Sequence, residues 1–169
     1  MKLLGLMIIA LSATAAGTLV CSAMKSHASE LLSITRITEL FYSEINCFDP
    51  PVTELVTNVY EAAKDEKSAY LLKKCIDEIK LSDFPNAVKA AKTCKSIDGY
   101  ISRDEYEHFF TFLSKLGTSD TESQLSLCKY YNGIFSRFAL KAEKYADTHC
   151  RLYFTLIITA ALTVGIFLI

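Results

Sequence analysis

Apolar residues recur every three or four positions through most of the chain, which is the spacing of one face of an α-helix. The first such helix is predicted over residues Glu30 to Ile45. Its apolar face consists of Leu31, Ile34, Ile37, Leu40, Phe41 and Ile45. Asp49 followed by two prolines predicts the start of a second helix, because proline fits the first helical turn. A third helix is predicted around Leu71 to Ile79, with apolar residues at the same spacing.

Three further helices are indicated mainly by their end signals. A fourth helix is predicted to start at Ser82 or Asp83, which are residue types that cap helix N-termini. The segment Ser102–Glu105 has the pattern of a capping box and predicts the start of a fifth helix, which ends at Gly117. A second pattern of the same kind, Ser119–Glu122, predicts the start of the sixth and longest helix.

No alternating strand pattern competes with these helical runs, so we expect an all-α fold. The six helices have short connections and are predicted to form a compact bundle, stabilised by disulfides, with an apolar segment at each chain end. Of the 169 residues, roughly 120 lie between these ends, which suits a single domain. The net charge is -1 and no basic run is present, so we expect no nucleic-acid partner.

The N-terminal segment resembles a secretory signal peptide. Lys2 is followed by an apolar run from Leu3 to Val20, and small residues follow at several spacings that a signal peptidase accepts. We therefore predict a signal peptide over residues 1–23, with its end between residues 17 and 28. The alternative is an uncleaved membrane anchor, because the apolar run is close to the length that spans a bilayer.

The C-terminal segment, residues 149–169, contains an uncharged apolar run from Leu152 to Ile169. This run predicts either the signal for a glycolipid (GPI) anchor or a retained transmembrane span. Ala146 and Asp147 are the candidate attachment residues, although the spacer after them is shorter than usual. Residues 24–148 would then form an extracellular helical domain, anchored at the cell surface and facing outside.

Cysteine pairing follows from this interpretation of the ends. The chain has six cysteines, and loss of both terminal segments would remove Cys21 and Cys150 and leave four. We predict the pairs Cys75–Cys94 and Cys47–Cys128. The first pair joins neighbouring helices, and the second ties the end of the first helix to the last one.

The stretch "CKSIDGYISRDE", residues 94–105, resembles the calcium loop of an EF-hand. Gly99 stands at the sharp central turn and Glu105 at the twelfth position, but Cys94 replaces the usual first carboxylate. The calcium ligands that this resemblance implies are Ser96, Asp98, Tyr100, Ser102 and Glu105. The alternative is a turn that leads into a capped helix, and we expect this alternative, with no bound metal or cofactor.

No arrangement of histidines, cysteines or carboxylates indicates catalysis, so we expect no enzymatic activity. The pattern predicts a non-enzymatic, secreted or surface-anchored interaction module for an unknown extracellular protein or lipid, attached to the membrane by its C-terminal segment. Overall it resembles the small cysteine-containing helical domains of unknown function that nematodes secrete. A lipid-binding or membrane-active protein is the alternative, and a weak calcium binder of the EF-hand type is a further one. Phe112 lies off the predicted core face, which indicates a partner surface or a lipid-accepting cavity, but we expect core packing.

Overall fold

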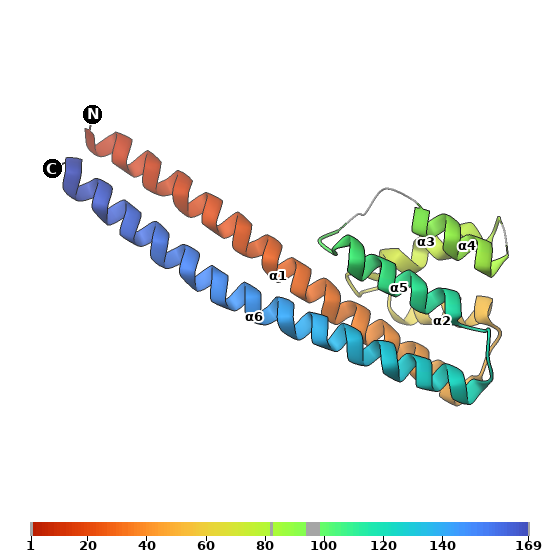
Figure 1. Cartoon of the computed structure of the whole chain (residues 1–169). Helices are drawn as coiled ribbons and strands as arrows, with labels where there is room; N and C mark the ends of the chain where they lie inside the picture. Colours follow the sequence, from red (N-terminus) through yellow and green to blue (C-terminus); the bar gives the residue numbers. More distant parts are fainter. Residues whose placement is uncertain (1, 82, 94–98, 169) are drawn as a thin grey trace. The chain divides into compact units, whose positions relative to one another are not determined.

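The computed structural model describes residues 2–81, 83–93 and 99–168, and this part of the chain is entirely helical apart from its connections. Figure 1 shows the order of the helices along the chain. The six helices are α1 (Lys2–Phe48), α2 (Val52–Ala62), α3 (Ala69–Ile79), α4 (Phe84–Thr93), α5 (Arg103–Lys115) and α6 (Thr121–Leu168). The predicted all-α fold with about six helices is confirmed.

The chain forms two compact units, and α1 and α6 contribute to both. The helix-pair unit consists of Met1–Ala28 and Leu140–Ile169. Within it, the first part of α1 and the last part of α6 lie side by side and antiparallel (Figure 1). The bundle unit consists of Ser29–Ala139 and contains the four short helices together with the remaining parts of α1 and α6.

Aromatic side chains from three helices form the centre of the bundle unit. Phe112 on α5 is fully buried, 5.5 Å from the Phe41 ring on α1 and 5.3 Å from the Tyr131 ring on α6 between ring centroids. Phe109 on α5 contacts the Phe135 ring on α6. The core explanation for Phe112 is therefore the correct one, because α5 is enclosed on more than one side.

The ends of α5 form as the local sequence predicts. The Ser102 hydroxyl accepts a hydrogen bond from the Glu105 backbone N–H at 3.4 Å, and the Glu105 carboxylate accepts one from the Ser102 N–H at 2.8 Å. Gly117 follows the helix with φ 73°, a left-handed conformation that suits glycine.

The cap of α6 differs by one residue from the prediction. Asp120, rather than Ser119, accepts from the Ser123 backbone N–H at 3.1 Å, and its other oxygen accepts from the Ser123 hydroxyl. These hydrogen bonds stabilise the ionised form and lower the pKa of Asp120. Asp and Ser have similar capping preferences, so the sequence "SDTE" leaves the exact start of the helix open.

The two long helices also differ from the predicted elements. The first was predicted to start at Glu30, after a separate terminal segment, but α1 is continuous from Lys2 to Phe48. No proline interrupts α1 or α6. The polar residues that suggested a boundary therefore lie inside one regular helix, because they are compatible with helical geometry.

Candidate functional site

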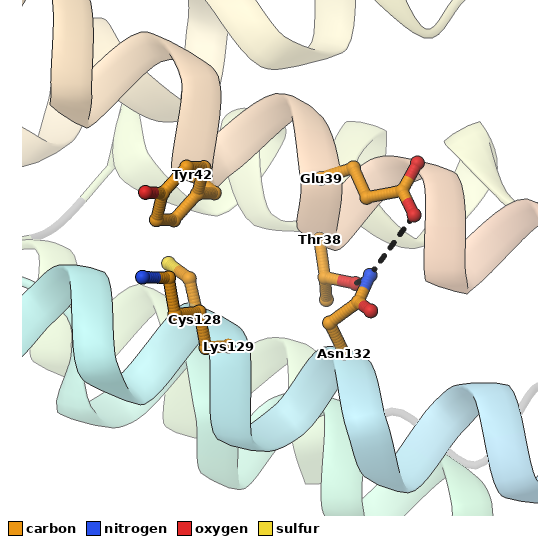
Figure 2. A pocket seen from close by; sticks show the side chains of 6 residues that line it. All are labelled: Thr38, Glu39, Tyr42, Cys128, Lys129 and Asn132. Carbon is orange, nitrogen blue, oxygen red and sulfur yellow. Dashed lines mark hydrogen bonds between the residues drawn. The ribbon is translucent and has the colours of Figure 1, made fainter.

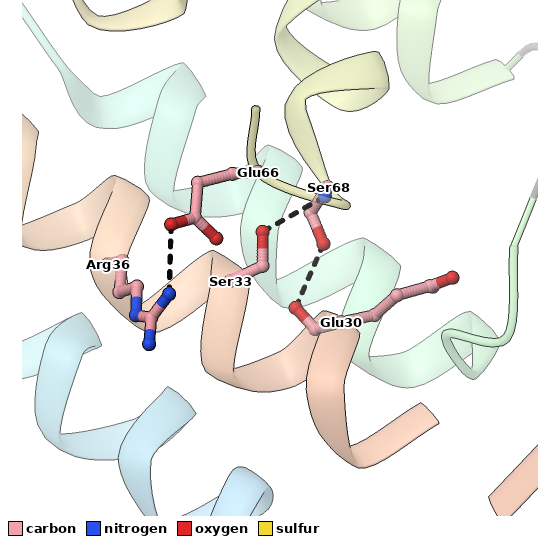
Figure 3. Close-up of polar contacts among 5 residues, drawn as sticks. All are labelled: Glu30, Ser33, Arg36, Glu66 and Ser68. Atoms are coloured by element: carbon pink, nitrogen blue, oxygen red, sulfur yellow. Dashed lines mark hydrogen bonds and ion pairs between the residues drawn. The ribbon is translucent and has the colours of Figure 1, made fainter. Parts of the chain in front are cut away.

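A buried polar junction holds the connection between α2 and α3 against α1 (Figure 3). The Ser68 backbone N–H donates to the Ser33 hydroxyl at 3.0 Å, and the Ser68 hydroxyl donates to the backbone oxygen of Glu30 at 2.9 Å. Both serines are buried, so these hydrogen bonds satisfy groups that water cannot reach. Arg36 and Glu66 form a more exposed ion pair beside them at 3.1 Å.

The Glu30 carboxylate, on a residue only 7% exposed, holds a second segment on α1. Its Oε2 atom accepts the backbone N–H of Tyr100 at 3.0 Å. Gly99 has φ 151°, and a Cβ atom there would lie 2.7 Å from the same carboxylate oxygen and 2.5 Å from the Tyr70 hydroxyl. Position 99 therefore favours glycine, because its backbone conformation is strained for other residues and a Cβ atom would displace the Glu30 and Tyr70 side chains. The junction has a structural role in positioning the residues before α5.

A pocket of about 200 Å³ lies between α1 and α6 in the bundle unit (Figure 2). It is lined by Thr38, Glu39 and Tyr42 from α1 and by Cys128, Lys129 and Asn132 from α6. The Asn132 amide nitrogen donates to the backbone oxygen of Thr35 at 3.1 Å and to the Thr38 hydroxyl at 3.3 Å. It also lies 3.4 Å from a Glu39 carboxylate oxygen. One polar side chain of α6 thus lies within hydrogen-bonding distance of three oxygen atoms of α1.

Two exposed residues of opposite charge, Glu39 and Lys129, line this pocket. The Lys129 ammonium is 5.2 Å from the centroid of the Tyr42 ring, within cation–π range. Glu39 supplies the carboxylate, and both charged residues are exposed. Exposed charges of this kind are screened by water, so the pocket lacks the dry environment that shifts acids and bases toward catalysis.

The buried thiols of Cys75 and Cys128 are poor nucleophiles. Burial raises the pKa of Cys75 to about 12, with a smaller contribution from the negative charge of Glu78. Burial also raises the pKa of Cys128, which lines the pocket, to about 12. The nucleophile is the thiolate, so both cysteines are in the unreactive form near neutral pH. Among the described residues, no three histidines, cysteines or carboxylates are placed to hold a metal ion.

We expect thiol reagents to distinguish the cysteines of the bundle unit. Cys47 is exposed, whereas Cys75 and Cys128 are buried with a pKa about three units above the ordinary value of 9.0, which lowers their thiolate fraction about 10³-fold. In a Cys94→Ser background at pH 8, Cys47 should be labelled first, with the two buried thiols labelled only after denaturation. Mass spectrometry of labelled peptides gives the order. Equal labelling of Cys128 and Cys47 in the folded chain would contradict the assignment.

The calcium ligands implied by the EF-hand resemblance of residues 94–105 are not brought together in the described part of this segment. Cys94, Ser96 and Asp98 lie outside the described residues. The side chains of Ser102 and Glu105 bond to each other's backbone in the capping box, and the Tyr100 N–H is held by Glu30. The capped-turn explanation accounts for the described part of this segment.

The predicted disulfides are also wrong. Cys47 and Cys128 are both free, one exposed and one buried. Cys75 is free as well, and its predicted partner Cys94 lies outside the described residues. The pairing was predicted on the assumption that Cys21 and Cys150 are removed with the terminal segments, whereas both are buried inside the helix-pair unit.

The terminal segments are parts of the two long helices α1 and α6. Ala146 and Asp147, the candidate sites for GPI attachment, lie in the interior of α6, and Ala146 is buried. The predicted signal-peptide boundary falls inside α1. In the portion of the chain that the structure describes, no helix combines the length and the apolar character needed to cross a membrane. The predicted anchor and the predicted transmembrane span are therefore both corrected.

Several structurally important residues were not anticipated from the sequence. The contacts of Glu30 with Tyr100 and of Ser68 with Ser33 join positions 70 and 35 residues apart. Periodicity cannot reveal such pairs, because it describes each helix alone. Asn132 does carry a local signal, since it interrupts an apolar stretch close to buried Tyr131 and Phe135.

A protein-family model described as stage III sporulation protein AB matches residues 2–169. A search of curated proteins and a search of solved structures each found no match. The family match includes both terminal segments, and it is to neither an EF-hand family nor a family of nematode secreted domains. The predictions of a secreted or surface-anchored binding module, of a lipid-binding or calcium-binding alternative, and of an extracellular location are wrong. The chain belongs to the stage III sporulation protein AB family.

Proposed function

We propose that this chain acts in sporulation as a non-catalytic structural component, and that its helix-pair unit joins it to apolar helices of another protein of the same process. The observation that carries this proposal is the exposure of large apolar side chains on both helices of that unit. Leu19 on α1 is 72% exposed, and Leu156 on α6 is 63% exposed. Leu11, Val20, Leu152, Tyr153 and Phe154 are exposed as well.

These side chains are distributed around the helices. Successive residues of a helix are rotated by about 100°. Leu152, Tyr153 and Phe154 therefore point in three different directions, and together they cover more than half of the circumference of α6. A helix that is apolar all round is stable when it is surrounded by other apolar groups. Two helices can cover only one stripe of each other, so a further apolar surface is needed to cover the rest.

The chemistry of the bundle unit supports a non-catalytic role. The thiols of Cys75 and Cys128 have raised pKa values, and Asn132 is engaged in hydrogen bonds that join α1 to α6. The Glu30 carboxylate is likewise engaged, with the Tyr100 N–H. These groups hold helices in place, and this is what a structural component requires.

Sporulation itself provides the test. In a spore-forming bacterium that lacks its own copy, the wild-type chain should restore heat-resistant spores. The triple variant Leu19→Gln/Leu152→Gln/Leu156→Gln should not restore them, because glutamine keeps the helix propensity of leucine but removes its apolar surface. The matched control is Phe48→Gln/Leu81→Gln, which changes equally exposed apolar residues of the bundle unit and should restore spores.

Two results would contradict the proposal. The first is normal sporulation with the triple variant at wild-type protein levels. The second is loss of sporulation with Glu39→Gln or Lys129→Gln in a chain that still folds by circular dichroism, since this would indicate that the pocket has a chemical role. Recovery of the purified chain with lipid vesicles alone, in the absence of any partner protein, would contradict the choice of a protein partner.

A further inference from the structure

Two cysteines face each other inside the helix-pair unit. Cys21 on α1 and Cys150 on α6 are both buried and both free. Gly17, one turn before Cys21, lies against Ile157, and Lys25, one turn after Cys21, lines a depression together with Cys150. This antiparallel register places the two cysteines opposite each other. They lie almost at opposite ends of the sequence, so their proximity is a property of the antiparallel pairing of α1 with α6 (Figure 1).

Small residues bring the two helices close together near this pair. Gly17 lies one turn before Cys21, and the Ile157 side chain occupies the space that a Cβ atom of Gly17 would need. Ala146, one turn before Cys150, is buried. Packed helices are ordinarily about 8–10 Å apart, whereas the Cα atoms of a disulfide lie about 4.4–6.8 Å apart. Small residues at this level permit the close approach of the two helices that a bridge requires.

The surroundings of Cys150 give a small molecule access to this pair. Cys150 lines a surface depression of about 520 Å³ together with Lys25, Asp147, Arg151, Phe154 and Thr155. The neighbouring Cys21 thiol raises the pKa of Cys150, burial adds to this effect, and the positive charge of Lys25 opposes it. The Cys150 thiol is therefore protonated near neutral pH, and its reactivity should increase as the pH rises.

We propose that Cys21 and Cys150 form a redox-active dithiol, which a low-molecular-weight disulfide converts into a disulfide that ties α1 to α6. One thiol loses its proton and attacks the small disulfide, releasing one small thiol and leaving a mixed disulfide. The second thiol then loses its proton and attacks the mixed disulfide, releasing the second small thiol. Two protein thiols are oxidised and one small disulfide is reduced to two thiols, so electrons and protons balance. The resting state is the dithiol that the structure contains, and the oxidised state holds the helix pair closed.

The test uses the full chain with Cys47→Ser and Cys94→Ser, which removes one exposed thiol and one thiol outside the described residues. The protein is treated with oxidised glutathione at pH 7, 8 and 9, quenched with acid, digested without reduction and mapped by mass spectrometry. We expect a peptide containing Cys21 linked to one containing Cys150, formed faster at each higher pH and reversed by a reductant. The cross-linked chain should also have a higher melting temperature than the reduced chain.

Matched variants make the outcome decisive. With Cys150→Ser, Cys21 should retain glutathione as a stable mixed disulfide, whereas Cys128→Ser in the bundle unit should leave the cross-link unchanged. Glutathione that remains on Cys21 or Cys150 of the parent chain, without a cross-link, would show that the helices are too far apart and would overturn the proposal. A link from either cysteine to Cys75 or Cys128, or no reaction at pH 9, would overturn it as well.

Discussion

Replacing Phe112 with alanine should lower the free energy of unfolding of the bundle unit by about 3–5 kcal/mol. The Phe112 ring is fully buried between α1 and α6. It makes an edge contact with Phe41 at 5.5 Å and lies 5.3 Å from Tyr131 and 6.4 Å from Phe109, between ring centroids. Truncation removes the apolar contacts and leaves a cavity, which a rigid aromatic cluster cannot fill by collapse.

Urea denaturation followed by circular dichroism measures this effect. Phe48→Ala is the matched control, because Phe48 is 75% exposed and its truncation should change stability by less than about 0.5 kcal/mol. Phe112→Leu should fall between the two, since leucine fills part of the volume. Equal effects of Phe112→Ala and Phe48→Ala would show that α5 does not pack on α1 and α6 as described.

Replacing Gly117 with alanine should destabilise the bundle unit by about 2–4 kcal/mol, although only one methyl group is added. Gly117 has φ 73°, a conformation that is strained for alanine. A Cβ atom at this position would also collide with the branched side chain of Val52, at the start of α2. The backbone strain and the steric overlap both disfavour alanine, so their effects on stability add.

Gly133→Ala provides a control with the same chemical change and the opposite expected sign. Gly133 lies inside α6, and a Cβ atom there has open space around it. Alanine is favoured over glycine in a helix interior by about 0.5–1 kcal/mol, so this variant should be more stable than the wild type. Melting curves give the melting temperature of each variant. A lower value for Gly133→Ala, or an unchanged value for Gly117→Ala, would contradict the local geometry.

The comparison of the two glycines illustrates which features could be predicted locally. Gly117 was recognised as a helix end because it follows the apolar spacing of α5, and Ser102 and Glu105 were recognised as its start because a capping box spans only four residues. Their hydrogen bonds form within one turn, so neighbouring residues are sufficient to specify them. The collision that a Cβ atom at position 117 would make with Val52 was not predictable, since it depends on how the end of α5 packs against α2.

The candidate sites were less accessible to sequence analysis for the same reason. Asn132 satisfies acceptors on α1, and Glu30 holds Tyr100, across distances in the chain that no short motif covers. The cysteines were misassigned because counting gives the number of possible pairs but not their positions. Cys21 and Cys150 were set aside with the terminal segments, yet the register of α1 against α6 places them opposite each other.

The sequence by itself determined the helical class, the buried faces of the short helices and the caps of α5, because apolar spacing and capping act over one or two turns. Only the tertiary structure decided that the two terminal apolar runs belong to the long helices α1 and α6, which pair with each other. An uncharged apolar run does not by itself specify its role. A signal peptide, a membrane span and a helix packed on another protein surface all require the same residue types. What distinguishes them is the apolar surface that covers the run, and that surface is supplied by parts of the fold, or by partners, far away in sequence.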